Sequence, residues 1–525
     1  MNSHSQIGGG TGPARRTESM LRYSPALVLI AVMIADSVRI ADPDLYGHLR
    51  FGQQILLAAR VPRFDTYSYS ITGLRWISHE WLSDVLLSWV YLHGGVVGLK
   101  LMKLGCTGAI VVLLLEAMRE TGASAVTQIS IMLVAGIRLS AQMQFRPQIF
   151  TYLLLAALLM LLTRDNFRGR AALWTTIPMF ALWANLHGGF VIGLGVMGLY
   201  AIVRGGQEIA AGRGTARFFH LAAVTSACIV ATLLTPYGVG SWLSVFHTIG
   251  NPAMLRAINE WQPLLSAMLA EYHSANTLFV YDISMFGIFF GALAAIAFSP
   301  NTDDLALIAI AAVLVASAFV QVRNVPLGMM AAMIPLARHA TLALRARRTP
   351  RSIGAVPPRP ISLLGQIILS IAAVALAAET GLFSGTLGLT EPYPSGALAF
   401  MRAHGLSGNM LCEYSWNDYV IFHEWPRDKV FLDSRFEMIY PRPIIEAYLA
   451  FTFDRAGAAQ TLAGFPNDFV LINPTTVAAD VMASAAKWTL IYSDSDSFLY
   501  ARRDSGAARI AGAPVRGTAL APIFP

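Results

Sequence analysis

Long apolar runs occupy most of the chain and leave few folds open to it. About eleven runs are long enough to span a bilayer, and they lie at roughly 24–41, 98–118, 123–142, 147–163, 171–186, 187–203, 218–236, 276–298, 304–321, 326–344 and 361–380. A helix needs about 20 residues to cross the hydrocarbon core, where only helices and closed barrels satisfy their own backbone groups. Charged residues make up only 13% of the chain. We therefore expect a mostly α-helical, polytopic membrane protein.

The stretch 80–93 decides the orientation of this protein. It is apolar but short, and it contains Glu80 and Asp84, which suits a helix on the membrane surface better than a span. Arginines accumulate in cytoplasmic loops, and here they gather in the N-terminal tail and at 164–170, 204–217 and 338–351. All four segments fall on one side only if 80–93 lies on the outer surface. We therefore expect the N-terminus inside and the C-terminus outside.

This topology divides the chain into four parts. A cytoplasmic tail (1–23) precedes a transmembrane domain (24–380), which has outer loops at 42–97 and 237–275. Polar composition after residue 385 indicates a small extracytoplasmic α/β domain over 385–503. Its expected strands lie at 428–433, 469–473, 488–492 and 497–502, and its helices at 393–404, 443–463 and 475–486. The tail 504–525 is rich in Ala, Gly and Pro, and we expect it to be disordered.

The net charge of +7 first suggests a nucleic-acid partner. Arginines that orient the helices in the membrane explain it better, so membrane lipids are expected as partners and nucleic acid is not. The three cysteines, Cys106, Cys228 and Cys412, lie far apart. Their spacing indicates neither a disulfide framework nor a zinc site.

The first outer loop carries the densest set of candidate site residues. Asp42, Asp44 and His48 follow the first apolar run, His79 directly precedes the stretch 80–93, and Glu80 begins it. The residues at 45–59 have apolar side chains at helical spacing and should lie along the membrane surface. Ionisable residues beside spans are functional candidates, although a single acid here could simply cap the next helix.

Two further polar groups lie at turns between spans. Asn185 and His187 precede two glycines where the chain reverses, and they either face an outer cavity or pack within a hairpin turn. Arg146 and Arg323 fall at outer span ends, against the usual bias of arginine. Their guanidinium groups suit a lipid phosphate, but snorkelling to headgroups is an equal alternative for each.

The outer loop 237–275 contains Glu260 beside Trp261. An aromatic face next to an acid could contact a sugar ring. Tryptophan is equally common in the interfacial belt of membrane proteins. The sequence leaves both interpretations of Trp261 open.

Several sequence patterns bear on the chemistry. The chain has no phosphate-binding loop, no serine-hydrolase elbow and no dinucleotide-binding glycine pattern. Asp42 and Asp44 have the Asp-x-Asp spacing that can hold a divalent metal ion through oxygen ligands, but this short pattern is unspecific alone. Asp433-Ser434-Arg435 follows an expected strand, where sites of α/β folds often lie. A structural salt bridge is the more common role for such a triplet.

The first loop resembles that of integral-membrane glycosyltransferases of the GT-C type, such as the protein mannosyltransferases and aminoarabinose transferases. The chain is most similar to a broad bacterial group of GT-C-like proteins, from Asp42 to about Arg502. That group shares an Asp-x-Asp with a following His, and its further motifs here are Pro62-Arg63-Phe64-Asp65, His79-Glu80-Trp81-Leu82, Arg146-Pro147-Gln148, Asn185-Leu186-His187-Gly188-Gly189, Pro236-Tyr237-Gly238, Glu260-Trp261-Gln262-Pro263 and Asp433-Ser434-Arg435. The group has aromatics between the second Asp and the His, whereas this chain has Tyr46-Gly47.

The resemblance implies a fold of about eleven transmembrane helices with juxtamembrane helices in the first loop, in the bacterial inner membrane. It also implies inverting transfer of a sugar from a polyprenyl-phosphate donor to an extracytoplasmic glycan, lipid or protein acceptor. Asp44, with Asp42 as second choice, would be the catalytic base. Arg146 and Arg323 would hold the donor phosphate, and His48, His79 and His187 would position substrate. A divalent metal ion is allowed at Asp42 and Asp44 but not required.

Two other classes of function share the outer-face polar residues. A transporter, flippase or assembly scaffold for envelope polysaccharide would bind lipid-linked sugar without transferring it. Transporters show internal repeats or broken helices at midplane, and no convincing repeat is visible in this chain. A polysaccharide ligase or polymerase would use a lipid-linked oligosaccharide, which the sequence does not exclude.

Overall fold

The computed structural model describes residues 40–169, 172–249, 259–272, 278–299, 303–346, 384–389, 392–510, 515–516 and 523–524. The expected tail 1–23 and the expected spans at 24–41, except for its last two residues, and at 361–380 lie outside the described residues. Ile40–Ala41 form a short strand, β1, rather than the end of a helix.

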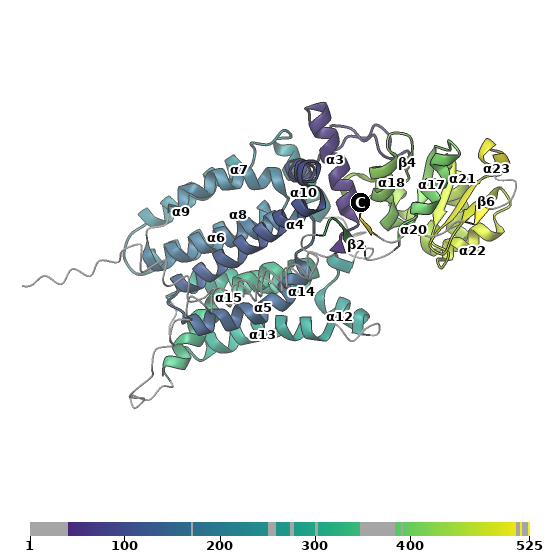
Figure 1. Cartoon of the computed structure of the whole chain (residues 1–525). Helices are drawn as coiled ribbons and strands as arrows, with labels where there is room; N and C mark the ends of the chain where they lie inside the picture. The colour runs from purple at the N-terminus through teal and green to yellow at the C-terminus, as the bar shows by residue number, and fades with distance from the viewer. Residues whose placement is uncertain are drawn as a thin grey trace, which may run out of the picture.

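Apolar helices form a bundle that makes up the larger part of the molecule (Figure 1). Within the described residues, five helical segments are long and apolar enough to cross a membrane. They are α4 (Trp81–Glu120), α5 (Ala125–Gln142), α6 (Gln148–Arg168), α8 (Phe190–Ala210) and the segment Val322–Ala346, which contains η4 (Val322–Asn324) and α15 (Val325–Ala346). Shorter apolar helices accompany them, namely α7 (Thr176–Leu186), α9 (Ala216–Ala231), α13 (Leu278–Ala297) and α14 (Leu305–Val320). The protein is therefore embedded in the membrane, as the apolar runs predict.

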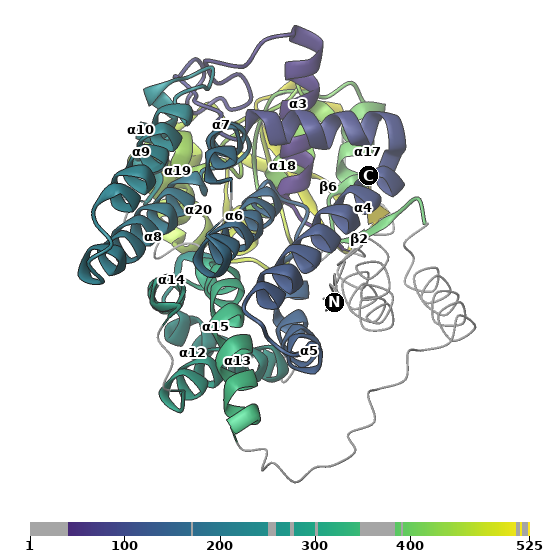
Figure 2. The same cartoon turned by 90° about the vertical axis from the view of Figure 1, so that its left-hand side faces the viewer.

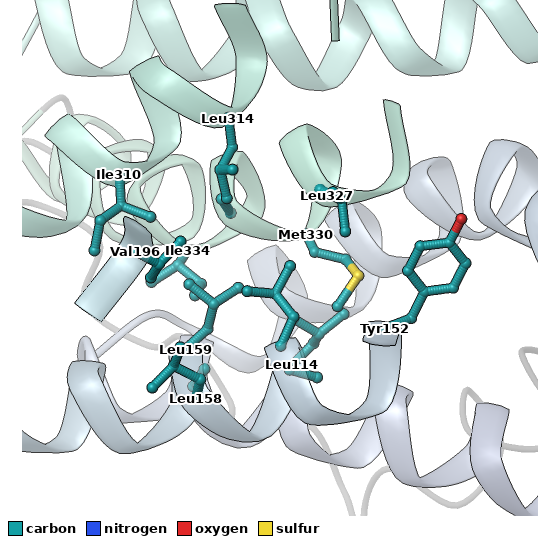
Figure 3. Close-up of a cluster of buried hydrophobic side chains, with 14 of the residues drawn as sticks. Leu114, Tyr152, Leu158, Leu159, Val196, Ile310, Leu314, Leu327, Met330 and Ile334 are labelled. Carbon is teal, nitrogen blue, oxygen red and sulfur yellow. The ribbon is translucent and has the colours of Figure 1, made fainter. Parts of the chain in front are cut away.

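The core of the bundle consists of interlocking aliphatic side chains. Leu114 of α4, Leu158 and Leu159 of α6, and Met330 and Ile334 of α15 are all 1% exposed or less. Figure 3 shows them converging from helices far apart in the sequence. Packing between helices, rather than contact with lipid, holds these segments together.

The first loop contains both expected juxtamembrane helices. One is α3 (Asp44–Ala58), and the other is the first part of α4, which is joined to the spanning part at Gly95, a residue with non-helical backbone angles (φ 56°, ψ −152°). Figure 2 shows the two parts of α4 running in different directions. Helix α3 packs closely on the first part, since a Cβ at Gly52 would lie 2.0 Å from the Asp84 carbonyl oxygen. The first loop therefore forms an ordered layer of helices at one end of the bundle.

The C-terminal region is a mixed α/β unit, as predicted. Its six-stranded sheet has the order β4 (Lys429–Val430), β3 (Asn409–Cys412), β5 (Phe469–Ile472), β7 (Phe498–Arg502), β6 (Trp488–Ser493) and β8 (Val515–Arg516). Strand β3 runs parallel to β4 and β5, whereas β7 is antiparallel to β5 and β6. The accompanying helices are α17 (Ser395–Ala403), α18 (Asn417–Glu424), α19 (Phe436–Ile439), α20 (Arg442–Phe453), α21 (Arg455–Gly464) and α22 (Val477–Ser484). The single helix expected at 443–463 is thus two, because Asp454 caps α21 by accepting from the Ala456 and Gly457 N–H groups.

The expectation of a disordered tail is wrong for the described part of 504–525. Helix α23 (Gly506–Ile510) follows β7, strand β8 pairs with β6, and β9 (Ile523–Phe524) pairs with β2 (Leu387–Leu389). Phe524 is fully buried and its ring centroid lies 4.7 Å from that of Tyr46. The composition of 504–525 does not predict this contact, because a single apolar residue, Phe524, makes it.

The α/β unit and the first loop share one hydrophobic core. Tyr46 of α3 packs edge-on against Tyr419 of α18, with ring centroids 5.1 Å apart. The Tyr69 N–H donates to the Val430 carbonyl oxygen across 3.1 Å. Figure 1 shows α3 and α18 lying between the bundle and the sheet. Any site in the first loop is therefore bordered by the C-terminal unit.

Candidate functional site

A cavity of about 470 Å³ lies where the first loop, the ends of several bundle helices and the C-terminal unit meet. Of the candidates predicted from the sequence it brings together Asp44, His48, His79, Glu80, Arg146, His187, Glu260, Trp261 and Arg323. Asp42 and Asn185 do not line it. Residues more than 200 positions apart in the chain thus meet at one place, which supports treating the cavity as the candidate site.

Arg146 binds three carboxylates at the edge of the cavity. Its Nε lies 2.8 Å from Asp42 Oδ2, one terminal nitrogen lies 3.1 Å from Asp44 Oδ2, and the other lies 3.0 Å from Glu260 Oε1. Charge-assisted bonds of this kind are short and directional. All three edges of the guanidinium are engaged, so Arg146 fixes the acids rather than presenting a free charge to a phosphate in this arrangement.

The two candidate bases differ in their surroundings. Asp42 Oδ1 accepts the Asp44 backbone N–H across 3.0 Å at the start of α3, and the Asp42 side chain is only 6% exposed. Asp44 is 25% exposed and lines the cavity. Burial raises the pKa of Asp44 to about 6, and the neighbouring Arg146 only partly opposes this. Asp44 therefore presents a carboxyl group of raised proton affinity to the cavity, whereas Asp42 does not line it.

His48 lies one turn beyond Asp44 on α3 and faces the same cavity. Its Nδ1 is 2.7 Å from Asp84 Oδ1. Burial lowers the pKa of His48, but the hydrogen bond and charge of Asp84 outweigh burial and raise it to about 9. His48 is therefore an imidazolium at neutral pH and adds a positive charge beside Asp44.

His187 presents an N–H to Glu80. The Gly189 N–H donates to His187 Nδ1 across 2.9 Å, so the ring proton resides on Nε2, which lies 3.3 Å from Glu80 Oε1. Burial lowers the pKa of His187 to about 3, which keeps the ring neutral. The turn needs its glycine, because a Cβ at Gly189 would lie 2.3 Å from Thr151 Oγ1. His79 Nε2 lies 3.6 Å from the same Glu80 oxygen, so both imidazoles lie beside Glu80 at the cavity wall.

Asn185 has partners that tie helices together. Its amide nitrogen donates to the carbonyl oxygens of Ala181 and Leu234, and its oxygen accepts from Trp81 Nε1 across 2.9 Å. The side chain therefore joins the start of α4 to α7 and to the end of α9. This arrangement corresponds to the packing alternative for Asn185 rather than to a group that faces the cavity.

Arg323 of η4 lines the cavity as well. Its guanidinium carbon lies 5.2 Å from the ring centroid of Trp261 in η3 (Asn259–Trp261). The Val322 N–H donates to the Gln262 carbonyl oxygen and joins η3 to η4. Within the described part of the chain no carboxylate lies within 4.0 Å of this guanidinium. Among these residues Arg323 therefore has no acid as a direct ion-pair partner, although its charge helps to lower the pKa of Glu80.

Two charged groups at the cavity were not predicted as site residues. Asp84 binds His48, and the sequence reveals it only as an acid in an apolar stretch. Arg435 lines the cavity and forms a buried ion pair with Asp65 of the first loop as well as with Asp433. The structural salt bridge expected for Asp433-Ser434-Arg435 is thus present, but it also joins the C-terminal unit to the first loop.

Asp418 of α18 approaches α3 at Gly47. A Cβ at Gly47 would lie 2.6 Å from Asp418 Oδ2 and 2.8 Å from its Cγ. Burial and the neighbouring Asp433 raise the pKa of Asp418 well above its usual value. The resemblance implies an aromatic residue at position 47, whereas in this chain the Asp418 side chain occupies the space beside Gly47.

We expect Gly47→Ala to destabilise the protein by about 1–3 kcal/mol, because the added methyl group overlaps a buried side chain. The apparent melting temperature of the detergent-solubilised protein measures the effect. Gly105→Ala is the matched control, since Gly105 is also helical and its Cβ would meet no atom within 4 Å. The double variant Gly47→Ala/Asp418→Ala should recover stability relative to Gly47→Ala alone; no recovery would show that the overlap is not the cause.

The arrangement of acids does not fit a metal centre. Among the described residues no group of three or more His, Cys, Asp and Glu side chains could hold a metal ion. Asp42, Asp44 and Glu260 instead surround the Arg146 guanidinium. The positive charge that a divalent ion would supply to these acids therefore comes from an arginine.

Comparisons with known proteins find likeness in structure alone. No family model and no curated protein sequence matches the chain. The archaeal oligosaccharyltransferase AglB from Archaeoglobus fulgidus, solved with an inhibitory peptide and a dolichol-phosphate, is similar with a TM-score of 0.55 and 12% identity over 92% of this chain and 74% of that one. The arabinofuranosyltransferase AftD from Mycobacteria is similar with a TM-score of 0.53 and 14% identity over 94% of this chain. The match spans 42% of AftD, and at these identities the likeness concerns the fold.

Proposed function

We propose that this chain, which has the GT-C-type glycosyltransferase fold, transfers a sugar from a polyprenyl-phosphate donor to an extracytoplasmic acceptor. The observation that carries the proposal is the position of Asp44. It lines the cavity with a pKa of about 6, while Arg323 enters the same cavity with no acid partner within the described residues. A base and a free cation in one cavity are what a hydroxyl acceptor and a phosphate leaving group require.

In the proposed reaction the acceptor hydroxyl oxygen attacks the anomeric carbon of the donor sugar. The bond between that carbon and the phosphate oxygen breaks, and the configuration inverts. Asp44 takes the hydroxyl proton, and the polyprenyl phosphate leaves with the bonding electrons. Arg323 stabilises the charge that develops on the phosphate, and the neutral His187 N–H and the His48 imidazolium orient the reacting groups.

Glu80, Glu260 and Trp261 support these groups. Glu80 lies beside the two imidazoles, and Glu260 binds Arg146. Trp261 lies beneath Arg323 and keeps its guanidinium at the cavity. We assign to Arg146 and Asp42 the orientation of Asp44 rather than a contact with the donor.

The proposal places the cavity on the outer face of a bacterial inner membrane, with the N-terminus inside. The lipid of the donor would reach the cavity from the outer leaflet. AglB, whose fold this chain shares, was solved with a dolichol-phosphate, which supports a lipid-phosphate donor. Mass spectrometry of surface glycans and lipid-linked intermediates in a deletion strain tests the function: a lost sugar with an accumulated donor names both substrates. Unchanged glycans and intermediates would contradict it.

We expect Arg323→Gln to weaken binding of polyprenyl phosphate at least about tenfold, because a charged hydrogen bond to a phosphate is lost. Undecaprenyl phosphate and the full-length protein in nanodiscs are suitable for a binding titration. Arg442→Gln is the matched control, since Arg442 is exposed on α20 in the C-terminal unit and pairs with Glu446. Binding that is unchanged in Arg323→Gln, as in the control, would place the phosphate elsewhere.

A further inference from the structure

The C-terminal unit contributes one wall of the cavity, and this wall differs from the rest. It consists of Tyr414, Ser434, Arg435 and Met438. Three of these side chains are half-buried and uncharged. The fourth, Arg435, is almost fully buried, with 3% of its side chain exposed.

Arg435 is held rigidly from two directions. Its Nε lies 2.8 Å from Asp433 Oδ1, and its Nη2 lies 2.5 Å from both Asp433 Oδ2 and Asp65 Oδ1. The guanidinium carbon also lies 4.4 Å from the ring centroid of Trp76 and 5.0 Å from that of Phe51. Among the described residues, Arg435 Nη1 is buried without a hydrogen-bond partner. A donor left unsatisfied on a cavity-lining residue is a group that a ligand can complete.

The charge of this group selects the kind of ligand. Two carboxylates, Asp65 and Asp433, already balance the single positive charge of Arg435. A phosphate would therefore meet no net positive charge at this wall, in contrast to Arg323. An uncharged hydroxyl can still accept the Nη1 hydrogen bond without bringing a further negative charge toward the two acids.

The base lies between the two ends of the cavity. On one side Asp44 is linked through Arg146 to Glu260, whose neighbour Trp261 lies under Arg323. On the other side, Gly47 of the same helix contacts Asp418, whose Oδ1 accepts the Ser434 N–H across 3.4 Å. With the donor phosphate at Arg323, the wall of the C-terminal unit remains open to the acceptor, which is the molecule that gives its proton to Asp44.

We propose that this wall is an acceptor subsite for an uncharged saccharide, and this inference rests on the proposed function. Arg435 Nη1 donates to a ring hydroxyl, and Tyr414 and Met438 contact the apolar face of the sugar. The acceptor is therefore a neutral glycan hydroxyl, and a peptide or phosphorylated group is a poorer ligand at this wall.

Met438→Trp tests the subsite without removing a buried ion pair, as Arg435 substitutions would. The probes are methyl glycosides and disaccharides of gluco, manno, galacto and arabino configuration, titrated by saturation-transfer NMR against the full-length protein in nanodiscs. We expect at least one neutral glycoside to bind, and Met438→Trp to weaken it about tenfold or more, which corresponds to a loss of ~1.4 kcal/mol. Met438→Leu should bind like the wild-type protein.

Undecaprenyl phosphate, titrated in parallel, separates this inference from the proposed function. Its binding should depend on Arg323 and be unchanged in Met438→Trp. If no glycoside binds, or if Met438→Trp leaves glycoside binding intact, the subsite is wrong although the donor site stands. If undecaprenyl phosphate fails to bind the wild-type protein, the proposed function itself fails, and with it the assignment of the wall to an acceptor.

Discussion

Asp44→Asn should lower sugar transfer by roughly 10²–10⁴-fold, the range that a positioned general base contributes. The amide keeps the size of the carboxyl group but cannot take the acceptor proton. Transfer in membranes that carry the variant, followed by mass spectrometry of the product, measures the loss. Because the Asp44 carboxylate accepts only one of the three ion pairs of Arg146, the fold should survive, and the apparent melting temperature checks this.

The pH profile of the wild-type protein gives an independent check on the same residue. A base with a pKa of about 6 is deprotonated above that pH and protonated below it. Transfer should therefore rise with pH through about 6 and fall about tenfold per pH unit below it. Asp42→Asn should lower transfer less than Asp44→Asn and retain this profile, since Asp42 acts through orientation. Full transfer in Asp44→Asn would refute the assignment of the base.

The helical part of the fold could be predicted because the length and hydrophobicity of each apolar run indicate a helix without reference to the rest of the chain. Length and hydrophobicity are enough to place most bundle helices, and Gly95 separates the surface part of α4 from the spanning part where the sequence predicts the boundary. Local composition does not reveal how closely the surface part packs on α3, where a Cβ at Gly52 would lie 2.0 Å from the Asp84 carbonyl oxygen. Order at Phe524 was also missed, because it depends on contact with Tyr46 from the other end of the chain.

The sequence predicts most of the residues that line the candidate site, but it does not predict which of these residues contact one another. Nine of the eleven candidates line one cavity, since polar residues beside spans have few other places to lie. Which of them bind one another depends on tertiary contacts. Arg146 was expected at a phosphate and is surrounded by acids instead. Arg435 lines the cavity, although the sequence marks it only as part of a triplet after an expected strand.

Arg146→Met should create a divalent-cation site among Asp42, Asp44 and Glu260. The substitution removes the guanidinium and leaves Asp42, Asp44 and Glu260 converging on one position, now without a counter-charge. Carboxylate oxygens are the preferred ligands of Ca²⁺ and Mn²⁺, and a site of this kind binds them with a dissociation constant on the order of 10⁻⁴–10⁻³ M. Cation-dependent stabilisation of the detergent-solubilised protein against heat measures the gain.

Arg146→Met should also abolish sugar transfer at neutral pH. Sugar transfer by the wild-type protein should be unaffected by metal chelators. Arg146 lowers the pKa of Asp44 against the effect of burial, so its loss leaves more of the base protonated, and the released acids repel one another. Arg146→Lys is the matched control: it keeps the charge and should gain no cation site. Arg146→Met/Glu260→Gln should bind the cation more weakly than Arg146→Met, because one ligand is gone. If the wild-type protein is stabilised by Mn²⁺ as strongly as Arg146→Met, the ion reaches these acids with the arginine in place, and the guanidinium does not take the role of the metal.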